Sequence, residues 1–164
     1  MTLIIRVADG NDLMAVLDVG RRTWPVTYGP IAGQDYVAMG LAKWWTEGAT
    51  IPAIRAGRVT VAELDGTVVG MASVGPHENY LVLWKLYVLP EFQGQGIGAA
   101  LVESVVSSAN GVHPEIRISY LTGNTLAQGF YGGKGFVEIS REPGCAGVPE
   151  SVWMQLQLDP KEQR

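Results

Sequence analysis

The chain has 164 residues, of which 47% are hydrophobic and 17% are charged, a composition that suits one domain built around one core. Its formal net charge of −4 argues against a general nucleic-acid-binding protein, because such proteins normally present a basic surface. The single cysteine, Cys145, excludes an internal disulfide and a cysteine-based metal cluster, and two histidines are too few for a histidine-rich metal site.

Membrane and export signals are absent from the sequence. No apolar run reaches the roughly 18 residues that a membrane-spanning helix needs. The first residues lack the basic flank, long apolar core and cleavage site of a secretory signal peptide. We therefore expect a cytoplasmic protein with no membrane partner, no nucleic-acid partner and no metal ion.

Hydrophobic periodicity and turn residues divide the chain into strands and helices. In chain order they predict a strand at 3–7, a helix that starts near Asp9 or Asn11 and ends before Pro25, a helix at 35–46, strands at 59–64, 68–74 and 80–88, a helix at 97–108, a strand at 116–121, a helix at 126–134, and strands at 136–141 and 152–158. The dipeptide Asp65-Gly66 is a strong signal for a tight hairpin between two of these strands.

This order of elements indicates an α+β fold, in which a mixed, mostly antiparallel central sheet carries helices on both faces. The hairpins supply antiparallel pairs, and one β-α-β crossover around the helix at 97–108 supplies a parallel pair. We expect one domain over residues 1–158, followed by a polar tail at 159–164.

The most informative segment is the glycine-rich loop between the strand at 80–88 and the helix at 97–108. Backbone N–H groups in the first turn of a helix have no partner inside the helix, and the positive end of the helix dipole lies there. Glycines at positions 94, 96 and 98 let the oxygen atoms of an anion approach the backbone without a Cβ in the way. The sequence therefore predicts a site for a phosphate-bearing ligand at this loop.

Two other interpretations of the loop compete with this one, the simpler being a flexible turn without a ligand. The second is a dinucleotide-binding fingerprint, because Gly94, Gly96 and Ala99 satisfy G-x-G-x-x-A and Glu115 lies about 20 residues further on. However, Glu115 would begin the next strand rather than end it, and too little chain follows to complete a doubly wound sheet. The phosphate loop of nucleotide hydrolases is excluded, because no Gly-Lys-Ser/Thr follows.

Two sequence blocks resemble those of one family. Gln93-Gly94-Gln95-Gly96-Ile97-Gly98 resembles the Q/R-x-x-G-x-G/A signature of the GNAT superfamily of acyl-CoA N-acyltransferases, in which this loop holds the pyrophosphate of coenzyme A. The block from Asn124 to Phe136 is similar to the family's N-x-x-A-x-x-F-Y-x-x-x-G-F. The resemblance covers the chain from about Ile4 to Leu158, and it implies the family's α+β fold and an N-acetyltransferase that uses acetyl-CoA.

The resemblance also implies where the cofactor binds. The N–H groups of the loop bind the pyrophosphate, and the backbone of the preceding strand runs beside the pantetheine arm and hydrogen-bonds its amides. The implied cofactor-binding residues are Leu86, Tyr87, Val88, Gln93, Gly94, Gln95, Gly96, Ile97, Gly98, Ala99, Asn124 and Tyr131. In this family the strand that carries the first three splays away from its neighbour, which leaves their backbone groups unpaired.

Acetyl transfer from a thioester to an amine needs an oxyanion donor and a proton for the departing thiolate. By the resemblance, the N–H of Val88 is the oxyanion donor. Tyr131 occupies the tyrosine position of the family's F-Y pair and is our candidate for the proton donor, since a phenol with a pKa of about 10 is protonated at neutral pH. A packed tyrosine with its hydroxyl bonded elsewhere is the alternative. Asn124 would cap the same helix and hydrogen-bond the cofactor.

The general base departs from the family pattern. Many relatives carry a glutamate at the position that Val82 fills here. Glu78 and His77 precede the same strand and are the nearest substitutes, and we take Glu78 as the candidate base, acting directly or through a water. A solvated loop charge is the alternative for Glu78. An acceptor amine that arrives neutral, or that loses its proton to water, would need no such residue.

The acceptor is expected to contact residues 21–45, because this region shapes the substrate groove in many family members. Trp24, Tyr28 and Trp45 are our candidate substrate-binding residues, since an aromatic wall suits a cation or an apolar group, with core packing as the alternative for each. We expect a small-molecule amine or a peptide N-terminus as the acceptor.

Family members often form homodimers, although no segment of this sequence by itself indicates one. The alternative function is a non-catalytic or regulatory acyl-CoA-binding module.

Overall fold

The computed structural model describes residues 2–145 and 147–158, and the tail expected at 159–164 lies outside the described residues. In chain order the elements are β1 (Leu3–Val7), the 3-10 helix η1 (Gly10–Asp12), α1 (Leu13–Ala32), α2 (Gln34–Trp44), α3 (Glu47–Arg55), β2 (Val59–Leu64), β3 (Thr67–His77), β4 (Tyr80–Val88), the 3-10 helix η2 (Pro90–Phe92), α4 (Ile97–Ala109), β5 (Glu115–Leu121), α5 (Thr125–Gly133), β6 (Val137–Glu142) and β7 (Ser151–Gln157). No helix in the described part of the chain is both long enough and apolar enough to cross a bilayer.

The strands form one sheet in the order β1-β2-β3-β4-β5-β7-β6. Every neighbouring pair is antiparallel except β4 and β5, which run parallel across the α4 connection. The hairpin between β2 and β3 turns at Asp65 and Gly66, both of which have positive φ, as a two-residue hairpin turn requires. The predicted mixed, mostly antiparallel sheet is therefore confirmed.

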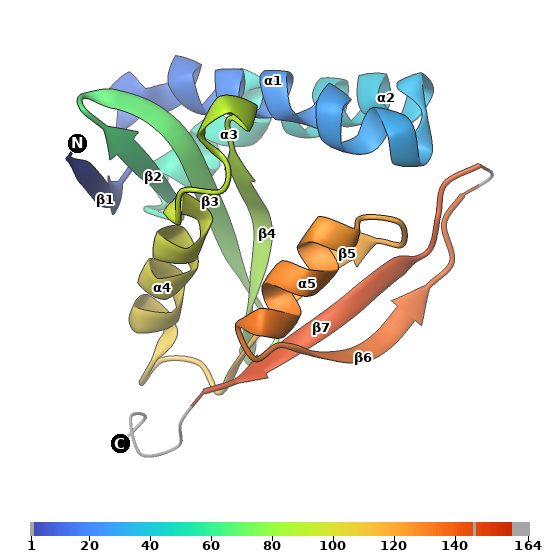
Figure 1. Ribbon diagram of the computed structural model, residues 1–164. Helices are drawn as coiled ribbons and strands as arrows, with labels where there is room; N and C mark the ends of the chain where they lie inside the picture. Colours follow the sequence, from blue (N-terminus) through green and yellow to red (C-terminus); the bar gives the residue numbers. More distant parts are fainter. Residues whose placement is uncertain (1, 146, 159–164) are drawn as a thin grey trace.

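The parallel pair β4 and β5 is hydrogen-bonded over only a short stretch. Leu81 pairs with Ile116 and Val82 pairs with Arg117, and among the described residues no pairing of these strands continues beyond them. Figure 1 shows the two strands meeting at one end and diverging towards α1 and α2, so that the sheet opens as a V. The last part of β4 therefore has a strand neighbour only on its β3 side.

Helices pack against both faces of the sheet, as the sequence predicts. Gly70 of β3 is opposite Val88 of β4, and a Cβ at Gly70 would lie 3.3 Å from Val88 and 3.4 Å from Leu101 of α4. These residues therefore face α4. Tyr87 precedes Val88 and points to the opposite face, which α1 covers, where its ring centre lies 5.4 Å from that of Trp45.

Helix α1 continues through Pro25 and Pro30, so the expected end before Pro25 is wrong. A proline inside a helix removes one backbone hydrogen bond and costs about 3 kcal/mol. Aromatic packing acts on the same turns, because the ring of Trp24 lies 4.5 Å from that of Tyr28 and is stacked 5.6 Å from that of Tyr36 in α2. These contacts form only when the helix continues past the proline, so tertiary packing overrides the local signal.

Helix α3 was not predicted from the sequence. Thr46 caps this helix, because its hydroxyl accepts a hydrogen bond from the backbone N–H of Ala49 at 3.2 Å. Glu47 in the first turn and Arg55 in the last complement the helix dipole. These three positions are the signal that the sequence offered, and Pro52 in the helix interior obscured it.

Gly20 interrupts the apolar face of α1 because an aromatic ring packs there. A Cβ at Gly20 would lie 2.0 Å from the ring of Trp45, a distance that no real contact allows. Trp45 is only 1% exposed, and this packing keeps it against the helix backbone. A glycine would weaken this helix in isolation. In the folded protein, Gly20 leaves the space that the Trp45 ring occupies, and so it stabilises the packing.

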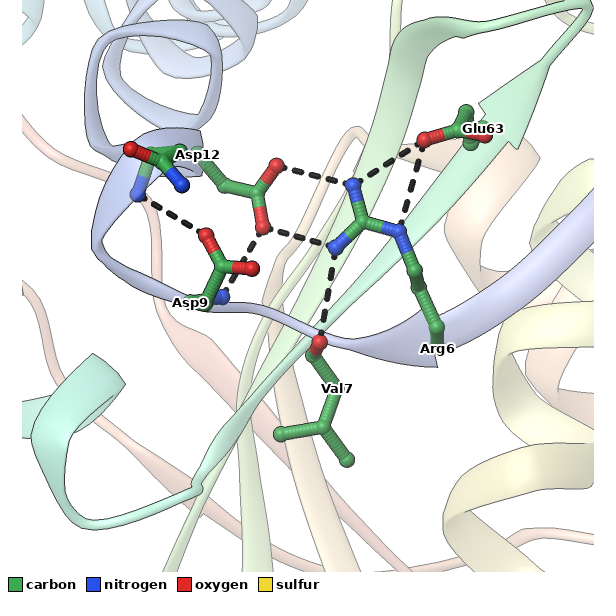
Figure 2. A network of polar contacts seen from close by, with 6 residues as sticks. Arg6, Val7, Asp9, Asp12 and Glu63 are labelled. Atoms are coloured by element: carbon green, nitrogen blue, oxygen red, sulfur yellow. Dashed lines mark hydrogen bonds and ion pairs between the residues drawn. The ribbon is translucent and has the colours of Figure 1, made fainter.

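A polar network ties β1 to the start of α1 and to β2 (Figure 2). The guanidinium group of Arg6 donates to both carboxylate oxygens of Asp12, at 2.8 and 2.9 Å, and to Glu63 at 3.0 Å. Asp12 also accepts a hydrogen bond from the backbone N–H of Asp9, as part of a capping box. The hydrogen bonds from Arg6 lower the pKa of Asp12 against the opposing effect of burial. The network therefore joins the turn before α1 to both β1 and β2.

Candidate functional site

The open edge of β4 presents backbone groups to the gap between β4 and β5. The N–H of Leu89 donates to the carbonyl oxygen of Val69 at 2.8 Å, so the backbone at Leu89 points towards β3. Because backbone direction alternates along a strand, the N–H and carbonyl groups of Val88 and Leu86 point the other way. The carbonyl oxygen of Val88 accepts a hydrogen bond from Gln93 Nε2 at 2.9 Å, which agrees with that direction.

The glycine loop leaves the start of α4 accessible. Gly94 and Gly96 have φ values of 80° and 83°, which other residues rarely adopt, and a Cβ at either would meet no atom within 4 Å. Gly96 is the N-cap of α4, and no side chain caps this helix. The first backbone N–H groups of α4 are therefore oriented into open space, as an anion site requires. Gly98 lies inside the helix, where a Cβ would be 3.6 Å from Phe130.

Side chains matter little at the other predicted loop positions. Gln93 and Gln95 are exposed, and Ala99 is partly buried in the first turn of α4. Ile97 is 3% exposed and contributes its side chain to the core. These residues can therefore contribute to an anion site chiefly through the backbone.

A cavity of about 450 Å³ lies on the α1 face of the sheet and spans the gap between β4 and β5. The aromatic residues that line it are Trp24, Tyr28, Tyr36, Trp44, Trp45, Trp84, Tyr87 and Tyr120. The three predicted substrate-binding residues are thus brought together, although Trp24 and Trp45 are 4% and 1% exposed and also belong to the core. Among the described residues that line the cavity, none is an aspartate or a glutamate, and the one charged side chain is Lys85.

Lys85 reaches the cavity because it lies two residues before Tyr87 in β4 and pairs with β3 in the same regular register, so the two side chains share the α1 face of the sheet. The register shifts between the pairs Ser73–Lys85 and Val74–Leu83, which leaves Trp84 as the extra residue of a bulge. Trp84 and Lys85 consequently both line the cavity, although they are neighbours in a strand.

The ammonium group of Lys85 is held by two neighbouring tryptophans. Its Nζ donates to the carbonyl oxygen of Trp44 at 2.5 Å and lies 4.1 Å from the centre of the Trp45 ring. Burial lowers the pKa of Lys85 to about 8. Lys85 is not among the site residues predicted from the sequence. Its signal there is that it is the one charged residue in the apolar strand β4.

Three tyrosines from three elements meet at the gap. The hydroxyl oxygens of Tyr28 in α1 and Tyr87 in β4 lie 2.9 Å apart. Tyr131 in α5 is 9% exposed and interacts electrostatically with both. Burial first, and the neighbouring hydroxyl of Tyr28 second, raise the pKa of Tyr87 and of Tyr131. Both phenols are therefore protonated at neutral pH and can donate a hydrogen bond.

Helix α5 fixes Tyr131 between aromatic neighbours. The predicted cap is confirmed, since Asn124 Oδ1 accepts a hydrogen bond from the N–H of Ala127 at 3.2 Å. The ring of Tyr131 lies 5.2 Å from that of Phe130 and 5.5 Å from that of Phe136. Tyr131 is thus packed against aromatic rings and also close to the gap. A packing role and a role as proton donor are therefore compatible for this residue.

Glu78 lies apart from the other predicted site residues. It is exposed in the turn between β3 and β4, with a φ of 53°, and His77 in the same hairpin packs against Tyr80. Val88 stands eight residues beyond Tyr80, which at about 3.3 Å per residue corresponds to about 26 Å. Val82 is 1% exposed and lies in the part of β4 that pairs with β5. Strand β4 therefore brings no carboxylate to the gap.

Glu115 also differs from the acid of a dinucleotide-binding fold. Strand β5 begins at Glu115, whereas that acid ends its strand. The carboxylate of Glu115 is paired with Arg117 at 3.1 Å. The glycine loop is therefore not part of a dinucleotide-binding fingerprint.

Comparison with known sequences is consistent with this geometry. Residues 55–138 match the family described as "Acetyltransferase (GNAT) domain". An uncharacterised N-acetyltransferase of Oceanobacillus iheyensis is 34% identical over 84 residues, which cover 47% of this chain and 48% of that protein. The chain spans about half the length of the curated relatives it matches, or less.

Solved structures are similar over nearly the whole chain. The PaiA N-acetyltransferase of Thermoplasma acidophilum, solved in complex with coenzyme A, superposes with a TM-score of 0.81 at 22% identity and covers 96% of this chain and 99% of that one. YncA of Salmonella typhimurium, solved with acetyl-CoA, gives a TM-score of 0.71 at 23% identity and covers 97% and 95%. At these identities the similarity shows a common fold.

Proposed function

The chain belongs to the GNAT family of acetyltransferases, and we propose that it moves an acetyl group from acetyl-CoA to a primary amine by direct attack in a ternary complex. The observation that carries the proposal is the position of the open edge of β4. This edge ends next to the glycine loop and borders the cavity that lies across the gap. A donor held at the loop and an acceptor held in the cavity would therefore meet at the end of β4.

The described residues fit coenzyme A in two ways. The open space at Gly94 and Gly96, in front of an uncapped helix start, suits the pyrophosphate. The backbone of Leu86 and Val88, which has no strand neighbour on the β5 side among the described residues, suits the amides of the pantetheine arm, which would pair with it as an added strand does. PaiA and YncA, which share the fold, were solved with coenzyme A and acetyl-CoA, and this similarity supports the same ligand here.

Acetyl-CoA, when bound, supplies an activated thioester. We assign the N–H of Val88 to the negative charge that develops on the thioester oxygen, because it points into the gap and pairs there with no strand in the described part of the chain. One such donor stabilises a transition state by about 3 kcal/mol. The group belongs to the backbone, so a change of the Val88 side chain does not test this assignment.

We assign Tyr131 to the departing thiolate. Its raised pKa keeps the phenol protonated, so that it donates a hydrogen bond to the sulfur as negative charge develops there. Overall, the amine loses one proton as the N–C bond forms, and the thiolate gains one as the C–S bond breaks. Tyr131 passes that proton to the sulfur and recovers one from the amine.

The acceptor amine attacks as the free base. Only the neutral amine has a lone pair for the carbonyl carbon, and Glu78 lies beyond Tyr80, which is itself about 26 Å along β4 from Val88. No carboxylate lines the described cavity. We therefore propose that the amine sheds its first proton to water on entry rather than to a side chain.

The proposal is tested by mixing the protein with acetyl-CoA and a panel of primary amines, with thiol release and the mass of the acetylated product as readouts. We expect release that depends on one class of amine. Calorimetry with coenzyme A provides the second readout. If coenzyme A does not bind, the assignment of the glycine loop is wrong.

A second candidate function is a non-catalytic or regulatory acyl-CoA-binding module. The lack of a carboxylate among the described residues that line the cavity favours it. The same experiment separates the two, because such a module binds acetyl-CoA while no amine stimulates thiol release.

A further inference from the structure

Lys85 is a partly buried cation without an acidic partner. The ion pairs found within residues 2–145 and 147–158 do not include it, and its hydrogen bond goes to the carbonyl oxygen of Trp44. A charge removed from water is normally paired, because its lost hydration is not otherwise replaced. An ammonium group has three protons, so Lys85 can serve two further acceptors inside the cavity.

Other polar atoms in the cavity wall, Trp45 Nε1 and Thr50 Oγ1 among them, also lack a hydrogen-bond partner within the described residues. Trp45 and Thr50 are 1% and 3% exposed, and both line the cavity. Within the described part of the chain, neither Trp45 Nε1 nor Thr50 Oγ1 has a hydrogen-bond partner. Buried polar atoms without a partner are uncommon, and an indole N–H can only donate. These two atoms are buried in the wall itself, so the described lining offers a ligand the positive charge of Lys85 and no negative charge.

We propose that the acceptor is an amino carboxylate, whose carboxylate group binds Lys85 in the cavity. This inference rests on the proposed acetyl transfer and names its substrate class. A carboxylate supplies the acceptor atoms and the negative charge that Lys85 lacks among the described residues. It also compensates the charge of Lys85 in a site that is shielded from water.

Charge also disfavours the other small amines. A polyamine would bring a second ammonium group into a cavity whose described lining holds one cation and no acid, and like charges in such a site repel. The aromatic walls formed by Trp24, Tyr28, Tyr36 and Trp44 suit an apolar substituent on the acceptor. The volume of about 450 Å³ falls in the range for small ligands. Amino acids with apolar side chains have all of these properties.

The test compares acceptors that differ only in the carboxylate. Acetyl-CoA turnover is measured with methionine against methioninamide, with phenylalanine against phenethylamine, and with spermidine and a short peptide amide. We expect kcat/KM for each amino acid to exceed that of its carboxylate-free partner by about 30-fold, as an ion pair with a partly buried ammonium group allows. A preference for spermidine or for the carboxylate-free partners would overturn the inference.

Variants connect the preference to Lys85. In Lys85→Met, which keeps the length of the side chain, the ratio between amino acid and carboxylate-free partner is expected to fall to about one, and Lys85→Arg is expected to restore part of it. Lys43→Met is the matched control, because Lys43 is exposed on α2 and does not line the cavity. An unchanged ratio in Lys85→Met would refute the role of Lys85.

A binding measurement separates failure of this inference from failure of the proposed function. Calorimetry compares N-acetylmethionine with its amide, in the presence of coenzyme A. If no amine is acetylated but the carboxylate binds in a manner that depends on Lys85, the proposed transfer fails and the anion site stands. If amines are acetylated without regard to a carboxylate, the transfer stands and this inference fails.

Discussion

The hydroxyl oxygens of Tyr28 and Tyr87 lie 2.9 Å apart, which links α1 directly to the open edge of β4. Tyr28 lines the cavity, and Tyr87 stands between the two residues whose backbone groups face the gap. The contact therefore holds the wall proposed for the acceptor against the strand proposed for the donor. Transfer between two bound molecules depends on such alignment, because a displacement of about 1 Å can cost a factor of about 100 in rate.

Replacing Tyr131 with phenylalanine tests the proposed proton donor. Tyr131→Phe is expected to lower kcat about 100-fold while the affinity for acetyl-CoA stays nearly unchanged, because only the developing thiolate loses a partner. Steady-state kinetics and calorimetry measure the two effects. Tyr80→Phe is the control, since Tyr80 is also buried but lies at the other end of β4. Equal activity of Tyr131→Phe and the wild type would remove Tyr131 from the mechanism.

Gly96→Asp tests the anion site at the glycine loop. The change places a carboxylate where the pyrophosphate is expected, and the affinity for coenzyme A should fall by about 100-fold or more, since like charges in contact repel by several kcal/mol. Gly66→Asp is a matched control, because Gly66 has a similar φ of 87° and equally open surroundings in the turn between β2 and β3. Both variants carry the same backbone strain, so calorimetry that finds equal affinities would contradict the site.

The pH dependence of turnover reports on Lys85. Its pKa of about 8 means that it is charged at neutral pH and neutral above pH 9. For a carboxylate acceptor, kcat/KM should first rise as the amine loses its proton and then fall above about pH 8. The other titratable residues of the cavity lining are Tyr28, Tyr36, Tyr87 and Tyr120, whose pKa values burial raises, so they stay neutral over this range.

A carboxamide acceptor serves as the control for that profile. It has no charge for Lys85 to bind, so the fall above pH 8 should be absent. If kcat/KM fell above pH 8 to the same extent with both acceptors, the fall would be caused by a group other than Lys85.

Gly20→Ala should destabilise the protein although alanine favours helices. In an exposed helix this change stabilises by about 1 kcal/mol. At Gly20 the new Cβ would lie 2.0 Å from the Trp45 ring, so we expect a net loss of about 2 kcal/mol in the free energy of unfolding. Gly48→Ala in α3 is the control, because a Cβ there meets open space, and it should stabilise. Urea denaturation measures both, and a stabilising Gly20→Ala would disprove the packing role of the glycine.

Asp12→Asn tests the network at the start of α1. The pKa of Asp12 is lowered in the folded protein, chiefly by Arg6, so its stabilisation is complete above the unfolded value of 3.8 and disappears as the pH falls through the folded value. We expect Asp12→Asn to lose about 1–3 kcal/mol at pH 7 and progressively less below pH 4. Asp18→Asn, at an exposed ion pair, should change stability by less than about 0.5 kcal/mol. A loss that is independent of pH would show that charge is not the cause.

The elements that sequence predicted correctly carry their signal locally. The Asp65-Gly66 turn, the glycine loop before α4 and the Asn124 cap of α5 each depend on the conformational or hydrogen-bonding properties of adjacent residues. The end of α1 was predicted wrongly, because Pro25 is a local signal and the aromatic packing that overrides it joins α1 to α2. The same limit applies to Gly20, which is explained only by a ring that lies 25 positions away in the chain.

The sequence by itself predicted most of the strand and helix pattern, the family and the proposed anion site of the loop, since these depend on spacing along the chain and on the chemistry of a few adjacent residues. Only the tertiary structure decided what surrounds the gap. Among the described residues, the divergence of β4 from β5 leaves Val88 without a strand neighbour on that side, and the bulge at Trp84 brings Trp84 to the cavity beside Lys85. Glu78 is separated from Val88 by the length of β4. Each of these outcomes depends on the pairing of strands that are distant in the sequence, which no local pattern encodes.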